Sequence, residues 1–186
     1  PAHAMRESRM EGDLWVFGYG SLLWNQGFPH VEQSLATLHG YHRSFCMRSI
    51  HHRGTDEVPG LVLALDAADG ARCRGVAYRV DPDHHDSTMD YLRERELISS
   101  AYLERIVPLD LADGRRVDAV AYVIDPDHVQ YCHLDLDEQA RIIAHAVGGR
   151  GPNTEYLYNT ANHLTEAGIE DTDLTWLARE VRRITA

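Results

Sequence analysis

Apolar and polar positions along the chain divide it into a strand-rich first part and a helix-rich last part. Bulky, aromatic and β-branched residues cluster or alternate in short runs that end at glycine, proline or aspartate, which is typical of strands. The expected strands cover residues 14–19, 34–47 with a kink at Gly40, 60–65, 73–80, 101–109 and 117–124. A turn at residues 67–70 predicts that 60–65 and 73–80 form a hairpin.

Helices are expected where good helix formers place apolar residues three and four positions apart. They cover residues 86–97, 135–147, 154–167 and a last segment that starts at Asp171 or Asp173 and runs to about Ile184. Asn153 is the expected N-cap of the third helix, because its side chain can accept a hydrogen bond from the first turn. Strands come first, one helix interrupts them, and no regular alternation of strand and helix follows. This order predicts the α+β class with a largely antiparallel sheet.

A short sequence echo links two of the expected strands. Residues 77–84 are Ala-Tyr-Arg-Val-Asp-Pro-Asp-His, and residues 121–128 are Ala-Tyr-Val-Ile-Asp-Pro-Asp-His. Two copies are too few for a repeat architecture. The echo predicts that two strands of similar role leave the sheet by the same turn.

Composition limits the number of domains. The 186 residues are 44% hydrophobic and 25% charged, which suits one globular domain with a sizeable core. We expect residues 14–186 to form this domain. Residues 1–13 are expected to be an N-terminal extension, partly derived from cloning, with the native start at Met5 or Met10.

Charge and cysteine usage exclude several classes of partner. Asp and Glu number 29 against 18 Lys and Arg, which gives a net charge of −11, and no run of basic residues marks a nucleic-acid site. No apolar run approaches the ~20 residues of a membrane helix, and the N-terminus lacks the apolar region of a secretory signal. The three cysteines are odd in number and widely spaced, which argues against a disulfide framework. We therefore expect a cytoplasmic protein that binds neither nucleic acid nor a membrane, and we expect a monomer.

The twelve histidines invite a metal site, but their spacing does not favour one. Residues 51–52 and 84–85 are adjacent pairs, which point in different directions, and neither H-E-x-x-H nor C-x-x-C occurs. We expect no metal and no other cofactor.

The sequence Gly18-Tyr-Gly-Ser21 follows the first expected strand. Glycine lets a backbone bend sharply and approach a ligand, and successive N–H groups in such a turn can form an anion site. The motif is not G-x-S-x-G, and no His or Asp motif marks a base for a nucleophilic Ser21. It also lacks the lysine of a phosphate loop and the third glycine of a dinucleotide fingerprint. By itself the motif favours a plain tight turn over a binding loop.

Two later segments each allow a structural and a functional interpretation. Residues 91–97 are charged and helical, which suits either a solvated face or a helix that presents a catalytic Glu. Residues 151–157 open a helix, either as a plain cap or as a helix end that closes over an anionic ligand together with Tyr156.

Six segments in order resemble one family. They are Trp15-Val-Phe-Gly-Tyr-Gly-Ser-Leu-Leu-Trp24, Phe45-Cys-Met-Arg-Ser-Ile-His-His-Arg-Gly54, Pro59-Gly-Leu-Val-Leu-Ala-Leu65, Cys73-Arg-Gly-Val-Ala-Tyr78, Tyr91-Leu-Arg-Glu-Arg-Glu96 and Gly151-Pro-Asn-Thr-Glu-Tyr-Leu157. Together they resemble the ChaC family of glutathione-specific γ-glutamylcyclotransferases, in particular its bacterial branch, over about residues 14 to 165.

This resemblance implies a fold, a reaction and a set of site residues. The fold is the γ-glutamylcyclotransferase-like small mixed β-barrel with flanking helices, and the reaction cleaves glutathione to 5-oxoproline and cysteinylglycine. Glu96, which follows Arg95, is the implied general acid/base. The implied substrate-binding residues are Tyr19, Gly20, Ser21, Leu22, Leu23, Arg48 and Tyr156, with Arg48 as a candidate clamp for a substrate carboxylate.

One departure from the family leaves two alternatives open. Family members often carry a glycine pair after the catalytic Glu, whereas this chain has Ser99-Ser100-Ala101. The chain could therefore be a cyclotransferase for other γ-glutamyl amines or dipeptides. It could also be a non-enzymatic sensor of γ-glutamyl peptides, although the presence of Glu96 argues against this.

Overall fold

The computed structural model describes residues 12–186. The extension expected at residues 1–13, with its two candidate start methionines, therefore lies outside the described residues except for the last two positions.

Five strands form a closed barrel in the order β1-β3-β2-β4-β5. Their bounds are β1 Trp15–Gly18, β2 His30–Ser49, β3 Gly60–Val80, β4 Tyr102–Leu111 and β5 Arg116–Ile124. The β1–β5 pair is parallel and the other pairs are antiparallel, so the barrel is mixed. The expected α+β class with a small mixed barrel is confirmed.

The prediction of a hairpin within residues 60–80 is wrong. These residues form one strand, β3, which pairs along its length with the equally long β2. His39 pairs with Arg72 and Tyr41 with Ala67, so extra residues of β3 bulge opposite Gly40. Gly40 has a φ of +86°, which glycine adopts without steric cost. The turn-like residues 67–70 are thus a bulge that bends a continuous strand, and the expected kink at Gly40 is confirmed.

Four α-helices accompany the barrel within the described residues. They are α2 His85–Glu96, α3 Leu136–His145, α4 Asn153–Glu166 and α5 Thr172–Thr185, and two 3₁₀ turns cover Ser21–Leu23 (η1) and Pro82–His84 (η2). Asp171 caps α5 by accepting a hydrogen bond from the Leu174 amide. A two-stranded hairpin that the sequence pattern did not predict, β6 Val147–Gly148 with β7 Gly151–Pro152, precedes α4.

The sequence echo marks the same turn twice, as expected. The Asp81 side chain accepts a hydrogen bond from the Asp83 amide at 3.0 Å where β3 ends, and Asp125 accepts one from Asp127 at 3.0 Å where β5 ends. The first of these turns leads into α2, so it sets where that helix begins.

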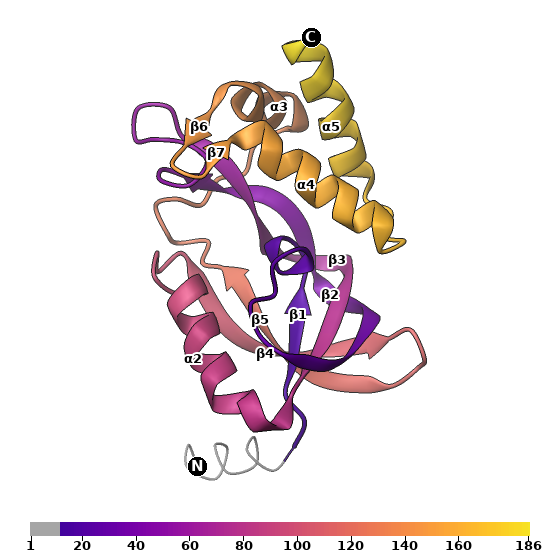
Figure 1. The fold of residues 1–186 in the computed structure, drawn as a ribbon. Helices are drawn as coiled ribbons and strands as arrows, with labels where there is room; N and C mark the ends of the chain where they lie inside the picture. Colours follow the sequence, from indigo (N-terminus) through magenta and orange to yellow (C-terminus); the bar gives the residue numbers. More distant parts are fainter. Residues whose placement is uncertain (1–11) are drawn as a thin grey trace.

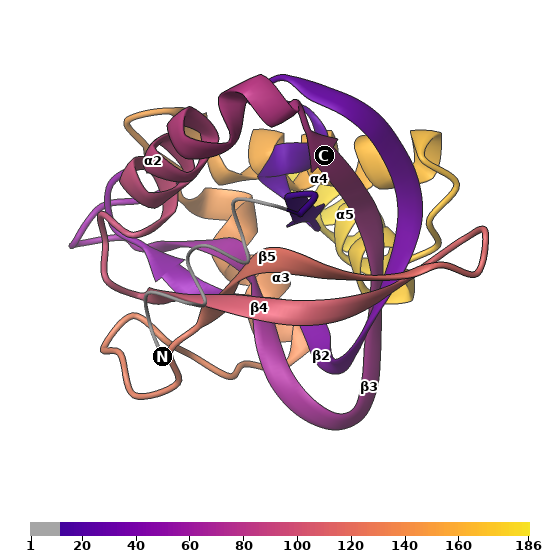
Figure 2. The same ribbon diagram turned by 90° about the horizontal axis from the view of Figure 1, so that it is seen from below.

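The helices occupy two separate places around the barrel. In Figure 1, α3, α4 and α5 lie together at one end, over β2 and β3, whereas α2 lies apart along the side. Figure 2 shows the same group of three helices behind the crossing strands β4 and β5. The site therefore draws residues from elements on different sides of the barrel.

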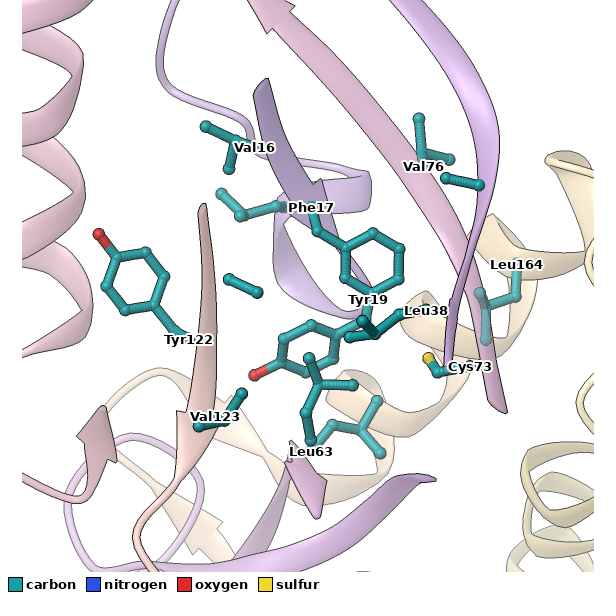
Figure 3. Packing of buried hydrophobic residues seen from close by; sticks show 14 of the residues in the cluster. Val16, Phe17, Tyr19, Leu38, Leu63, Cys73, Val76, Tyr122, Val123 and Leu164 are labelled. Carbon is teal, nitrogen blue, oxygen red and sulfur yellow. The ribbon is translucent and has the colours of Figure 1, made fainter. Parts of the chain in front are cut away.

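The hydrophobic core fills the barrel and continues under α3–α5. Apolar side chains from all five strands share one cluster with residues of the helices. In Figure 3, Phe17 from β1 and Leu63 from β3 lie on either side of the Tyr19 ring. An apolar interior that continues up to Tyr19 excludes water from one side of the turn after β1.

Candidate active site

A small cavity, with a volume of about 40 Å³, opens where β1 runs into η1. Ten residues line it: Phe17, Tyr19, Gly20, Ser21, Leu22, Leu63, Glu96, Tyr102, Tyr122 and Tyr156. They come from β1, the two residues that follow it, η1, β3, the end of α2, β4, β5 and α4. Six of the residues expected in the site are therefore brought together around one hollow.

The turn at residues 19–22 presents backbone donors to this cavity. Strand β1 ends at Gly18, where an added Cβ would lie 2.9 Å from the Tyr78 ring, so the close packing requires glycine. Within residues 12–186, the amides of Gly20, Ser21 and Leu22 donate to no protein acceptor. The Tyr19 carbonyl, in contrast, is occupied by the Nε–H of Arg43 at 2.8 Å. The turn thus offers N–H groups to a ligand.

Glu96 is the last residue of α2, and its carboxylate faces the cavity. Its side chain is only 15% exposed, and burial raises the pKa of this carboxyl above its usual value. Arg95 opposes the shift, since its Nε lies 3.4 Å from Glu96 Oε1. A buried carboxylate with a raised pKa is a better proton acceptor near neutral pH than an exposed one.

Arg95 connects the end of α2 to the turn. Its Nη2 donates to Ser21 Oγ at 2.8 Å, and its Nη1 donates to the Tyr91 hydroxyl at 3.0 Å and to the Asn25 carbonyl. The guanidinium therefore makes its hydrogen bonds to groups other than the carboxylate beside it. Glu96 itself accepts no hydrogen bond from residues 12–186, which leaves its oxygens available.

Four tyrosines surround the carboxylate. Burial is the main cause that raises the pKa of each phenol, and the charge of Glu96 raises all four further. For Tyr156 the value is about 12. All four rings are therefore neutral at physiological pH and act as hydrogen-bonding groups. Figure 3 shows the Tyr19 hydroxyl pointing toward the side of the barrel that carries Tyr122 and Val123.

The opposite wall of the cavity is fixed by hydrogen bonds to β3. The Tyr156 hydroxyl accepts the Leu63 amide at 3.1 Å, and the Tyr102 hydroxyl donates to the Leu63 carbonyl at 3.0 Å. Asn153 is fully buried and exchanges two hydrogen bonds of 2.8 Å with the backbone of Leu61. The expectation that Asn153 caps α4 is therefore wrong, because its side chain fastens the helix to β3 and Pro152 holds the cap position.

Two of the expected site residues do not line the cavity. Leu23 belongs to η1, and its side chain packs against the apolar core. Arg48 lies near the end of β2, where its amide donates to the Gln130 carbonyl at 2.8 Å. Neither residue is among those that face Glu96.

Sequence reasoning did not identify four residues of the lining, namely Phe17, Leu63, Tyr102 and Tyr122. The echo was an available signal for one of them, since Tyr122 and Tyr78 hold equivalent places in its two copies. Tyr122 reaches the cavity, and Tyr78 donates to the Leu22 carbonyl at 3.3 Å. Both copies thus place a tyrosine against the site.

Of the two serines after Glu96, Ser100 has a backbone conformation that favours glycine. Ser100 has a φ of +54°, in the left-handed region that favours glycine. Its hydroxyl lies 3.3 Å from His128 Nε2.

Comparisons with known proteins agree on one family. The ChaC-like protein family matches residues 14–184. The chain belongs to the ChaC-like family. Among its ChaC relatives is the glutathione-specific γ-glutamylcyclotransferase of Escherichia coli K12, which is 38% identical over 180 residues, covering 95% of this chain and 76% of the relative. The γ-glutamylcyclotransferase 2-3 of Arabidopsis thaliana is 34% identical over 178 residues, covering 92% and 89%.

The fold also has a solved counterpart. The crystal structure of a γ-glutamyl cyclotransferase specific to glutathione from yeast has a TM-score of 0.82 at 25% identity, covering 94% of this chain and 100% of that one. The resemblance to the ChaC family inferred from the six segments is therefore confirmed.

Two further observations concern other kinds of site. Among residues 12–186, no three His, Cys, Asp or Glu side chains are grouped so that they could hold a metal ion. Over the same residues, every helix is too short or too polar to span a membrane.

Proposed function

We propose that this chain is a γ-glutamylcyclotransferase that cleaves glutathione to 5-oxoproline and cysteinylglycine, with Glu96 as general acid/base. One observation carries the proposal: a buried carboxylate with a raised pKa and no hydrogen-bond donor from the described residues shares a cavity with a turn of unused amides. The names of the E. coli and yeast relatives support the substrate.

The nucleophile in this reaction belongs to the substrate. The α-amine of the γ-glutamyl group attacks its own γ-carbonyl carbon, so a new C–N bond closes a five-membered lactam. Glu96 takes a proton from the α-ammonium, and the carbonyl oxygen becomes an oxyanion. When the oxyanion collapses, the C–N bond to cysteine breaks and Glu96 returns the proton to the departing amine. The ring nitrogen loses its second proton to solvent as it becomes the neutral lactam N–H, and the released amine takes up a proton from solvent to become an ammonium. No protein nucleophile and no cofactor takes part.

The surroundings of Glu96 supply position and charge stabilisation. The amides of Gly20, Ser21 and Leu22 bind the oxyanion or the α-carboxylate, and the loss of one such donor costs about 3 kcal/mol in known cases. Tyr19 and Tyr156 bound the space in which the glutamyl chain curls, and a fixed folded conformer lowers the entropic cost of ring closure. Arg95 is a positioning residue, because it joins the turn to the end of the helix that carries Glu96.

Leu23 and Arg48, the two expected residues outside the cavity lining, have indirect roles in this proposal. Leu23 supports the turn from the core. Arg48 lies outside the cavity lining, so as a carboxylate clamp it would contact a part of the substrate that extends beyond the cavity.

Product analysis by mass spectrometry tests the function. The chain is incubated with glutathione, glutathione disulfide, γ-glutamyl-alanine and γ-glutamyl-cysteine, and 5-oxoproline is measured. Release of 5-oxoproline and cysteinylglycine from glutathione alone supports the proposal. Turnover chiefly of γ-glutamyl-alanine would assign the chain to the wider class of cyclotransferases, and binding without any product would indicate a sensor.

The setting of the reaction is part of the same proposal. We place it in the cytoplasm, which the three free, buried cysteines support. We also propose that the protein is a monomer. Light scattering of the purified protein tests the oligomeric state.

A further inference from the structure

Basic side chains gather beside the cavity, although the net charge of the chain is −11. His51, His52 and Arg53 lie in the loop of residues 50–59, and Arg150 lies in the turn between β6 and β7. We call these four residues the basic corner. Burial lowers the pKa of His52, and the positive charges of the other three members lower it further. The four groups are therefore close enough to act on one another.

The corner is built by direct backbone packing. The Gly149 and Arg150 amides donate to the carbonyls of the two histidines at 2.7 and 2.9 Å. A Cβ at Gly148 would lie 2.4 Å from the Gly54 amide nitrogen, so no side chain separates the hairpin from the loop. Figure 1 shows the loop and β6–β7 side by side. The arrangement brings two of the six family segments together, residues 45–54 and 151–157.

Arg53 is the mostly buried member of the corner, and its hydrogen-bonding capacity is only partly used. Its side chain is 12% exposed. Nη1 donates to the Pro152 carbonyl at 3.1 Å and lies 3.8 Å from the half-exposed carboxylate of Glu155. Within residues 12–186, its Nε and Nη2 donate to no acceptor. A guanidinium carries five N–H donors in a fork that matches a carboxylate, so Arg53 can donate two hydrogen bonds to a ligand carboxylate.

Arg53 also lies beside one wall of the cavity. Its guanidinium carbon lies 5.7 Å from the centre of the Tyr156 ring, whose hydroxyl lines the cavity. The positive charges of Arg53 and Arg95 both lower the pKa of Tyr156 against the larger effect of burial. Two extended residues, the length of cysteinylglycine, span about 7 Å.

We propose that Arg53, with the basic corner behind it, binds the terminal carboxylate of the departing dipeptide. The inference rests on the proposed function and adds the determinant of its leaving-group selectivity. It assigns the role of carboxylate clamp to Arg53, in place of the earlier candidate Arg48. Substrates that carry a carboxylate two residues beyond the scissile amide gain a charge-assisted hydrogen bond, and substrates that lack it do not.

The test compares two substrates on two enzymes. Glutathione is paired with glutathione amide, in which a carboxamide replaces the glycine carboxylate, and wild type is paired with Arg53→Met. We expect wild type to prefer glutathione by roughly ten- to a hundredfold in kcat/KM, mostly through KM. Arg53→Met should lose this preference and turn over the amide as wild type does. Arg179→Met, the same charge change on the exposed surface of α5, should keep the preference.

Each other result overturns the inference. Equal losses for both substrates in Arg53→Met would show a structural role, and an unchanged preference would show that another group binds the carboxylate. Equal use of the two substrates by wild type would exclude the clamp outright. Should Arg53→Met fail to fold, Arg53→Lys replaces it, and an undiminished preference in that variant would overturn the role of Arg53. Arg53→Lys, which keeps the charge but not the fork, should retain part of the preference. A wild type that forms 5-oxoproline from neither substrate would instead remove the proposed function.

Discussion

Two arginine–carboxylate pairs lie next to the same turn, residues 19–22. They differ in how many hydrogen bonds join the arginine to its carboxylate partner. Arg43 is 3% exposed, and it donates to the carbonyls of Tyr19 and Arg74 and to Asp171 Oδ2, which lies 3.0 Å from its Nη1. Arg95 donates to Ser21 and to other groups, and only a 3.4 Å approach joins it to Glu96.

The difference separates a structural pair from a reactive one. Asp171 meets the charge of Arg43 and also caps α5, so this pair ties the turn to the helices. The side chain of Glu96 is almost as little exposed as that of Asp171. Because no hydrogen bond from the described residues replaces its lost hydration, its pKa rises. A buried charge that is fully hydrogen-bonded stabilises an arrangement, whereas one that is weakly paired is ready to exchange a proton.

The largest expected effect comes from removing the reactive carboxylate. Glu96→Gln keeps the size of the side chain but cannot transfer a proton, so we expect kcat/KM for glutathione to fall by roughly 10²- to 10⁴-fold. Release of cysteinylglycine is the measurement. Glu94→Gln is the matched control, because Glu94 is exposed on the same helix and should be replaceable. A folded Glu96→Gln protein with the wild-type rate would refute the assignment.

The structural pair should show its effect in stability. Arg43→Met leaves Asp171 buried without its partner, and breaking such a pair costs about 3–5 kcal/mol in the free energy of unfolding. Urea unfolding followed by circular dichroism measures it. Arg95→Met should cost clearly less, because its guanidinium is more exposed and its carboxylate partner is held weakly. If both variants lost the same free energy of unfolding, the distinction between a structural and a reactive pair would be wrong.

Ser21 tests whether the turn binds or reacts. If its hydroxyl only receives the hydrogen bond of Arg95, Ser21→Ala should lower kcat/KM by roughly tenfold. A covalent nucleophile would instead cost on the order of 10⁶ in kcat. Ser87→Ala, at an exposed position of α2, provides the control for the substitution itself. A millionfold loss with Ser21→Ala would require a different mechanism.

The smallest expected effect is a shift in pH dependence. Glu96 must be ionised to accept a proton, so activity falls as the pH drops through its pKa. Arg95 holds this pKa down against burial, and Arg95→Met should therefore raise it and move the acidic limb of the kcat/KM profile to higher pH. Arg95→Lys keeps the charge and should leave the limb near its wild-type position. A limb that stays fixed in Arg95→Met would mean that Arg95 does not act on Glu96 electrostatically.

Local patterns predicted most elements but not how they pair. Residues 14–19, 86–97 and 117–124 were placed to within a residue or two, because alternation and helical spacing are properties of neighbouring residues. The bulge in β3 resembles a hairpin turn in sequence, since both need turn-forming residues between two apolar runs. Only the pairing of β3 with β2 distinguishes them, and that pairing joins residues far apart in the chain.

The candidate site shows the same division. The glycine turn and Glu96 were identified from motifs, whereas the tyrosines of β4 and β5 carry no local mark of function. Asn153 looked like a cap because it stands at a helix start, and its buried partner Leu61 is about ninety residues away. Arg48 and Arg53 belong to one segment, and nothing in that segment indicates which of them faces Tyr156.

The sequence by itself therefore determined the class of fold, the family, and the presence of a flexible glycine turn and an acid that follows an arginine. The tertiary structure decided that the turn and the acid share a cavity and that tyrosines enclose them. It also decided that every nitrogen of the Arg43 guanidinium donates a hydrogen bond, whereas the guanidinium of Arg53 keeps unused N–H donors among the described residues. Burial and hydrogen bonding between distant segments set the pKa of Glu96, and these depend on the closed barrel rather than on any stretch of residues.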